Sequence, residues 1–181
     1  MITLATKITF LRIVLILPII YLTYLATFYT NLFALIIFIF AGLTDYLDGF
    51  IARKTNTETK LGGLLDLLAD KLLVSLVLIW LVTINNSLLF VIPVLLIVLR
   101  EFIISSTRQF MVEMQGKNNV QVSIIGKSKT TVQLIATALI IISPNLGPDF
   151  YNFSLTILWL ASFISLFSLY IYLSQWLQMI D

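Results

Sequence analysis

Two reactive residue types are missing from this chain, because its 181 residues include no cysteine and no histidine. The absence of cysteine excludes disulfides, thiolate metal ligands and a thiol nucleophile, and the absence of histidine excludes an imidazole base. Any acid, base or metal-binding chemistry must therefore depend on carboxylates.

Charged residues are also scarce. They make up 11% of the sequence, whereas 60% of it is hydrophobic. Soluble domains contain about 45–50% apolar and about 25% charged residues, so this composition indicates a membrane protein. The net charge of +2 is too small to indicate a nucleic-acid partner.

Long apolar runs recur along the whole sequence. Each reaches the roughly 20 residues that a helix needs to cross a bilayer, and together they predict one domain over residues 1–181. We expect helices because lipid offers no hydrogen-bond partner for free backbone groups. The predicted spans are 8–27, 31–53, 62–84, 87–111, 125–143 and 154–177. The predicted fold is an all-α membrane protein, a six-transmembrane-helix bundle.

The eleven basic residues predict the orientation of this bundle. None of them lies in the first, third or fifth predicted connection, at 28–30, 84–86 and 143–153. Since basic connections remain in the cytoplasm, we expect both termini and the second and fourth connections on that side. The predicted location is the cell membrane, with the functional site facing the cytoplasm.

Four aspartates occupy the predicted membrane helices: Asp45 and Asp48 near the end of the second, and Asp66 and Asp70 near the start of the third. A charge at the centre of a membrane helix costs about 2.5–3.5 kcal/mol, so such residues are usually functional. Spacings of three and four residues place each pair on one helix face, and the short connection makes the two helices antiparallel neighbours. Oxygen ligands suit Mg²⁺, Mn²⁺ or Ca²⁺ rather than zinc. We therefore predict a divalent metal site, with Mg²⁺ as the default ion.

Neighbouring residues indicate what the metal would bind. Gly49 and Gly62 allow a flat group to approach the backbone, and Arg53 lies about two turns after Asp45, where it can fork onto a phosphate. Carboxylates, metal, glycines and an arginine are together suited to a pyrophosphate. A carboxylate left partly free could take a proton from an attacking hydroxyl.

These residues resemble the signature of the CDP-alcohol phosphatidyltransferase family, DxxDGxxAR, then eight residues, then GxxxDxxxD. The matching positions are Asp45, Asp48, Gly49, Ala52, Arg53, Gly62, Asp66 and Asp70. The resemblance implies that the first, second and third of the four aspartates bind metal. It implies that Asp70 is the general base and approaches a second ion, so that two Mg²⁺ or Mn²⁺ ions are expected.

The same resemblance implies the donor substrate, CDP-diacylglycerol. Gly49, Arg53 and Thr59 would contact its CDP moiety, and Ala52 and Gly62 would leave room for it. The implied reaction is transfer of the phosphatidyl group to an alcohol with release of CMP, carried out by a homodimer.

Basic residues in the fourth and fifth predicted helices bear on the acceptor. Segments 100–108 and 126–133 resemble the branch of the family that uses sn-glycerol 3-phosphate, and the candidate acceptor-binding residues are Arg100, Arg108, Lys127 and Lys129. Four cations exceed what an uncharged acceptor would need. Thr9 and Arg12 match the N-terminal part of that branch, whereas Ala5 and Thr6 replace its usual Pro and Asn. Glu101 is expected to pair with a neighbouring cation.

Three alternatives remain open at this point. The acceptor can be serine, inositol phosphate or a lipid alcohol instead. The four candidate acceptor-binding cations can instead set the orientation of the helices in the membrane and attract anionic lipid head groups. The aspartates can form an ion or proton pathway, although such a pathway would not need Gly49, Arg53 and Gly62 at this spacing.

Overall fold

The computed structural model describes residues 4–55, 60–85, 87–115 and 124–180, and nearly all of them are helical. The helices are α1 (Leu4–Leu25), α2 (Phe28–Thr55), α3 (Lys60–Ile84), α4 (Leu88–Gln115), α5 (Ile124–Ile142) and α6 (Pro148–Ile180), with a 3-10 turn, η1, at Ser143–Asn145. Within those ranges no β-strand occurs. The predicted all-α class is therefore confirmed.

Each predicted span corresponds to one of these helices, and the largest difference lies at the start of α6. That helix begins at Pro148, six residues before the predicted position 154. Proline suits the first position of a helix because the N–H that it lacks would have no helical partner there. Gly147, just before it, has φ +92°, a backbone conformation that favours glycine. A tight turn at η1 and Gly147 therefore replaces the longer predicted connection.

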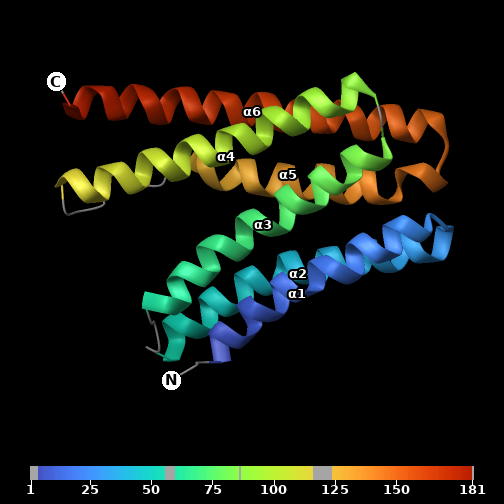
Figure 1. Ribbon diagram of the computed structural model, residues 1–181, viewed down its shortest axis with the longest axis horizontal. Helices are drawn as coiled ribbons and strands as arrows, with labels where there is room; N and C mark the ends of the chain where they lie inside the picture. Colours follow the sequence, from blue (N-terminus) through green and yellow to red (C-terminus); the bar gives the residue numbers. More distant parts are fainter. Residues whose placement is uncertain (1–3, 56–59, 86, 116–123, 181) are drawn as a thin grey trace.

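The helices form two groups of three (Figure 1). In the first group α1 packs against both α2 and α3, and in the second α6 packs against both α4 and α5. Contacts of α5 with α2 and α3, and of α3 with α4, join the groups. The site predicted on α2 and α3 therefore borders the helices that carry the acceptor candidates.

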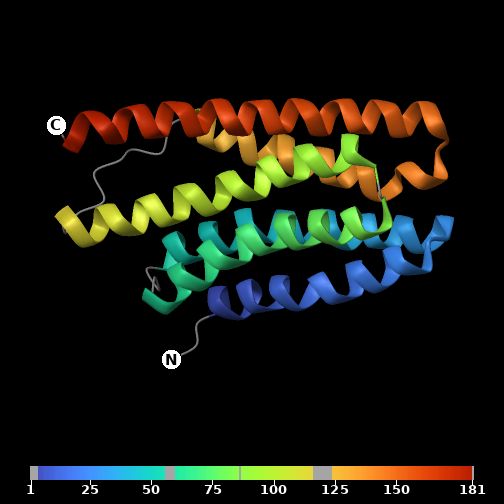
Figure 2. The same ribbon diagram turned by 45° about the horizontal axis from the view of Figure 1, so that its top comes forward.

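The ends of the helices follow the predicted alternation. The start of α1 and the end of α6 lie at one end of the bundle, on the left in Figures 1 and 2, together with the end of α2, the start of α3 and the end of α4. The turns from α1 to α2, from α3 to α4 and from α5 to α6 lie at the opposite end. The helix ends that flank the predicted basic connections are thus at the same end of the bundle as the start of α1 and the end of α6.

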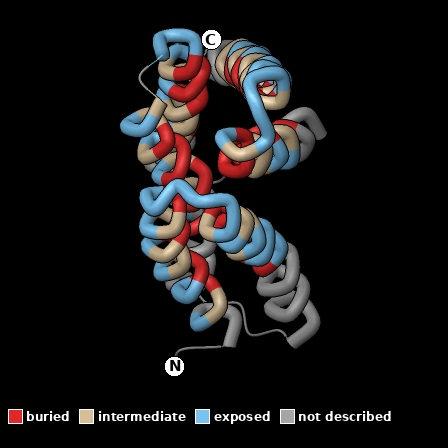
Figure 3. Tube along the Cα trace, turned by 90° about the vertical axis from the view of Figure 1, so that its right-hand side faces the viewer, coloured by how far each residue is buried: buried red, intermediate tan, exposed pale blue. Residues whose placement is uncertain are grey.

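The core lies between the helices, and the outside of the bundle is apolar as well. Buried positions lie mainly where helices meet in the end-on view (Figure 3). The largest buried apolar side chains include Phe38, Leu78, Phe90 and Ile140. Large exposed apolar side chains include Leu17, Leu95 and Phe163. An apolar exterior around a packed interior is what lipid as a solvent requires.

Candidate membrane-spanning segments occur within the described part of the chain. Three helical segments there are long and apolar enough to cross a bilayer, Lys7–Leu25, Leu88–Thr107 and Pro148–Ser174. Shorter apolar helical segments run over Phe28–Thr44 and Lys71–Ile84. These segments support the membrane character, while the number of six spans stays a prediction.

Candidate active site

The four predicted metal ligands lie on two helices that contact each other. Asp45 and Asp48 are on α2, and Asp66 and Asp70 are on α3. With a rise of about 1.5 Å per residue, Asp48 lies roughly 10 Å before the end of α2 and Asp66 roughly 9 Å after the start of α3. The two pairs are therefore at similar depth in the bundle. Their side chains lie outside those that the structure describes.

The predicted CDP-lipid contacts follow the same two helices. Gly49, Ala52 and Arg53 are on α2 and Gly62 is on α3, and their surroundings also lie outside the described side chains. Thr59 lies outside the described residues altogether. The roles of these residues stay predictions.

Arg12 brings a cation from α1 to the start of the aspartate motif. Its side chain is only 1% exposed, and its Nε donates a hydrogen bond to Thr44 Oγ1, 3.4 Å away. The Thr44 hydroxyl in turn donates to the carbonyl oxygen of Ala41 at 2.7 Å. Thr9, three residues before Arg12, is also buried. Both N-terminal candidates are thus buried, and Arg12 contacts the residue that precedes Asp45.

Two of the acceptor candidates meet at one carboxylate. Glu101 Oε1 accepts a hydrogen bond from Arg100 Nη1 at 3.3 Å and another from Lys129 Nζ. Arg100 lies on α4 and Lys129 on α5, and both side chains are buried. The expectation that Glu101 pairs with a neighbouring cation is confirmed.

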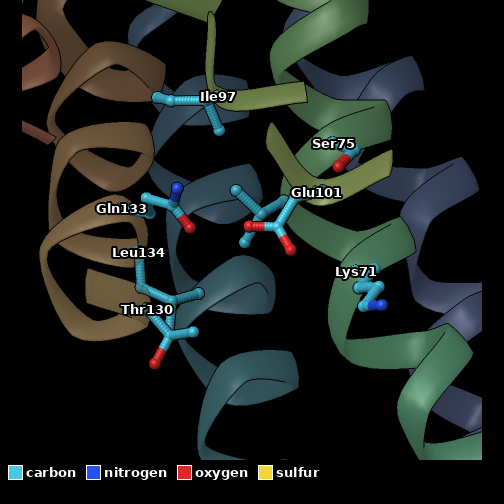
Figure 4. A pocket seen from close by; sticks show the side chains of 8 residues that line it. Lys71, Ser75, Ile97, Glu101, Thr130, Gln133 and Leu134 are labelled. Carbon is cyan, nitrogen blue, oxygen red and sulfur yellow. The ribbon is translucent and has the colours of Figure 1, made fainter. Parts of the chain in front are cut away.

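A small cavity opens beside this carboxylate, between α3, α4 and α5 (Figure 4). Its volume is about 20 Å³, which is enough for one water molecule and too little for glycerol 3-phosphate. Its polar lining consists of Lys71, Ser75, Glu101, Thr130 and Gln133. The amide of Gln133 and the carboxylate of Glu101 face each other across it. The cavity thus brings polar groups of three helices together beside Glu101.

Lys71 links the cavity to the aspartate motif. It directly follows Asp70 on α3, and its Nζ donates a hydrogen bond to Ser105 Oγ on α4. The Ser105 hydroxyl also donates to the carbonyl oxygen of Glu101, one turn earlier, at 2.7 Å. The helix of the predicted base is thus tied to the helix that carries Arg100 and Glu101.

Helix α6 contributes polar contacts that the sequence analysis did not find. Ser168 Oγ accepts a hydrogen bond from Arg100 Nη2 at 3.0 Å, and Ser165 Oγ accepts one from Gln133 Nε2 at 3.4 Å. Ser162, Ser165 and Ser168 recur every third residue and are buried. Serine is enriched where membrane helices contact one another, and the recurrence of serine on one helix is the signal that could have revealed these contacts.

The other two acceptor candidates can be placed only by their helices. Arg108 lies on α4 and Lys127 lies near the start of α5. Their side chains are outside the described ones, so their predicted role stays untested. Of the four candidates, the structure brings together Arg100 and Lys129.

The donor set of the aspartate motif fits a divalent ion. Two contacting antiparallel helices each carry a pair of carboxylates at similar depth. In a chain without histidine or cysteine, these provide only oxygen ligands, as Mg²⁺ and Mn²⁺ prefer. The residues present are therefore chemically suited to the predicted metal.

Comparison with known proteins identifies the class of this membrane protein. Residues 2–167 match the family model of the CDP-alcohol phosphatidyltransferases, and the chain belongs to this family. Similar proteins include the CDP-diacylglycerol–glycerol-3-phosphate 3-phosphatidyltransferases of Escherichia coli strain K12 and of Shigella flexneri serotype 5b. Each is 35% identical over 169 residues, which cover 93% of this chain and 92% of the relative. The protein of the same name from Salmonella choleraesuis is 34% identical over the same shares.

Proposed function

We propose that this protein transfers the phosphatidyl group of CDP-diacylglycerol to sn-glycerol 3-phosphate, giving phosphatidylglycerophosphate and CMP. The main structural support for glycerol 3-phosphate as the acceptor is the cluster of Arg100, Glu101 and Lys129, which lies beside α3, the helix of Asp66 and Asp70. Among the charged side chains described around the cavity, Lys71, Arg100 and Lys129 outnumber Glu101. Buried cations of this kind favour a phosphorylated acceptor over a neutral one.

The burial of this cluster also bears on the alternative that these cations serve only topology. Attraction to lipid head groups requires charges that reach the membrane surface. Arg100 is 6% exposed and Lys129 is 3% exposed, so neither is arranged to meet head groups. The names of the similar proteins, which specify glycerol 3-phosphate, support the same acceptor.

The proposed reaction assigns a part to each aspartate. Asp45, Asp48 and Asp66 would hold Mg²⁺ or Mn²⁺, and Asp70 would approach the second of two ions. When bound, such ions neutralise a diphosphate and stabilise the charge on the leaving phosphate. Asp70 would take the proton of the acceptor hydroxyl. The acceptor oxygen then bonds to the lipid-linked phosphorus, and the bond from this phosphorus to the bridging oxygen breaks to release CMP.

The remaining signature residues would hold the CDP moiety. Arg53 can donate two parallel hydrogen bonds to a phosphate, and Thr59 would add a further polar contact. Gly49, Ala52 and Gly62 would leave room for the nucleotide close to the helix backbones.

The proposal also includes the setting of the enzyme. All six helices would cross the cell membrane, with both termini and the active site on the cytoplasmic side, where glycerol 3-phosphate is available. The absence of basic residues from the connections at the opposite end of the bundle supports this orientation. The acyl chains of the donor would remain in the bilayer. The homodimer that the family resemblance implies stays part of the prediction.

A CMP-release assay tests the proposed function. Purified protein is given CDP-diacylglycerol, Mg²⁺ and, one at a time, glycerol 3-phosphate, serine, inositol phosphate and a lipid alcohol. We expect CMP only with glycerol 3-phosphate. Release with another acceptor alone would keep the family chemistry but overturn the acceptor, and no release with any acceptor would favour the ion-pathway alternative.

A further inference from the structure

We propose that Glu101 is a positioning residue of the acceptor site, one that holds Arg100 and Lys129 in the orientation needed to bind the phosphate of glycerol 3-phosphate. This inference rests on the proposed function and deepens it. Glu101 would act through the two cations and would not touch the substrate itself.

The first argument is the sharing of one oxygen by two helices. Glu101 Oε1 accepts hydrogen bonds from Arg100 Nη1 and from Lys129 Nζ. The glutamate and the arginine are on α4, whereas the lysine is on α5. The carboxylate therefore sets the distance between two cations whose backbones belong to different helices.

The second argument is that Arg100 is held from a second side. Its Nη1 donates to Glu101, and its Nη2 donates to Ser168 Oγ on α6 at 3.0 Å. A planar guanidinium bound at both terminal nitrogens has little rotational freedom. The last helix thus takes part in holding the side chain of Arg100.

The third argument concerns charge. A carboxylate next to the substrate phosphate would repel it, so Glu101 is unsuited to direct contact. Its side chain is 15% exposed and its carboxylate points into the gap between α3 and α5 (Figure 4). Held between two cations, it lowers the cost of keeping both of them buried before the acceptor arrives. Cations that are already ordered lose less entropy when they bind an anion.

Steady-state kinetics of three variants test the positioning role. Glu101→Ala removes the carboxylate, and we expect it to raise the apparent KM for glycerol 3-phosphate at least about tenfold while the KM for CDP-diacylglycerol stays within about twofold. Glu101→Asp keeps the charge and should recover part of this loss. Ser168→Ala should raise the same KM by a smaller factor.

The matched control is Asp149→Asn, which also removes one carboxylate charge. Asp149 is exposed in the first turn of α6, at the opposite end of the bundle from the start of α1. We expect both KM values of this control to equal those of the wild type. Equal increases in both KM values for Glu101→Ala, or an unchanged KM for glycerol 3-phosphate, would overturn the positioning role.

A double-mutant cycle separates this inference from the proposed function. The thermal unfolding of Glu101→Ala, Lys129→Ala and the double variant is measured in detergent without substrate. We expect the Tm shift of the double variant to differ from the sum of the two single shifts, because the two side chains contact each other. A double shift equal to that sum would show that Glu101 does not hold Lys129 and would overturn the inference. If the wild type uses another acceptor, the proposed function fails, and the KM comparison is repeated with that acceptor to decide the positioning role.

Discussion

Arg12 Nε donates a hydrogen bond to Thr44 Oγ1 across 3.4 Å, and so joins α1 to α2 at the residue before Asp45. The arginine is almost completely buried, at 1% exposure. A charge inside a membrane bundle is costly and is usually functional. The first helix, which carries no residue of the aspartate signature, therefore borders the predicted metal site.

Arg12→Ala is expected to lower CMP release on the order of tenfold, equivalent to about 1.4 kcal/mol of transition-state stabilisation. The variant removes the contact that fixes α1 beside the helix turn carrying Asp45. The measurement is kcat/KM for CDP-diacylglycerol, with the Tm in detergent recorded to show that the variant is folded.

Lys7→Ala is the control for Arg12, because it also removes a cation from α1 but its side chain is exposed. We expect its kcat/KM to match that of the wild type. A similar decrease in both variants would show that net charge, and not the contact with Thr44, causes the effect.

Asp70→Asn is expected to bind CDP-diacylglycerol normally but to lose turnover by about 10²–10⁴-fold, the usual contribution of a general base. The amide has nearly the same shape as the carboxylate but cannot accept the proton. Binding of the CDP-lipid and single-turnover release of CMP are measured separately. Near-normal turnover would exclude Asp70 as the base.

Removal of divalent metal is expected to abolish CMP release, because the carboxylates would then have no cation with which to hold the diphosphate. The protein is treated with EDTA and dialysed, and activity is measured before and after addition of Mg²⁺, Mn²⁺ or Zn²⁺. We expect Mg²⁺ and Mn²⁺ to restore activity, since the site provides oxygen ligands only. Full activity after chelation would contradict the metal assignment.

The helices were predictable because each apolar run is long enough to cross a membrane. The start of α6 was not, because a proline after a glycine suits both a loop and the first position of a helix. Pro148 takes the helical position, after Gly147 has turned the chain with a positive φ. The predicted loop and the observed helix start are both compatible with this dipeptide, so the sequence pattern alone did not decide between them.

The aspartate motif could be predicted from the sequence more fully than the contacts of the acceptor candidates. The aspartates could be recognised because their spacing follows the period of the helix. The partners of Arg100 could not be assigned, because Ser168 lies 68 residues away in the sequence. Glu101 was expected to find a cation, yet its bond to Lys129 depends on how α4 and α5 lie in the bundle. Periodicity shows which face of a helix is polar but not which helix it meets.

Arg108→Ala and Lys127→Ala are expected to raise the apparent KM for glycerol 3-phosphate by roughly tenfold or more, since a hydrogen bond to a charged group contributes about 1.5–3 kcal/mol. The KM for CDP-diacylglycerol should change little. Both constants are measured in the CMP-release assay. Equal changes in the KM values for both substrates would indicate that Arg108 and Lys127 serve membrane topology and do not bind the acceptor.

The absence of cysteine makes the proposed orientation directly testable, because any single cysteine introduced is the only thiol in the protein. Leu146→Cys lies in the turn between η1 and α6, and Leu146 is 47% exposed. Lys117→Cys lies in the fourth predicted connection, 112–124, outside the described residues. In intact cells a membrane-impermeant maleimide should label the first variant and not the second. After permeabilisation both should react, which controls for accessibility of the thiol. In the proposed arrangement α5 crosses the membrane once between the two positions, so that they face opposite sides. Labelling of both variants in intact cells would contradict this arrangement.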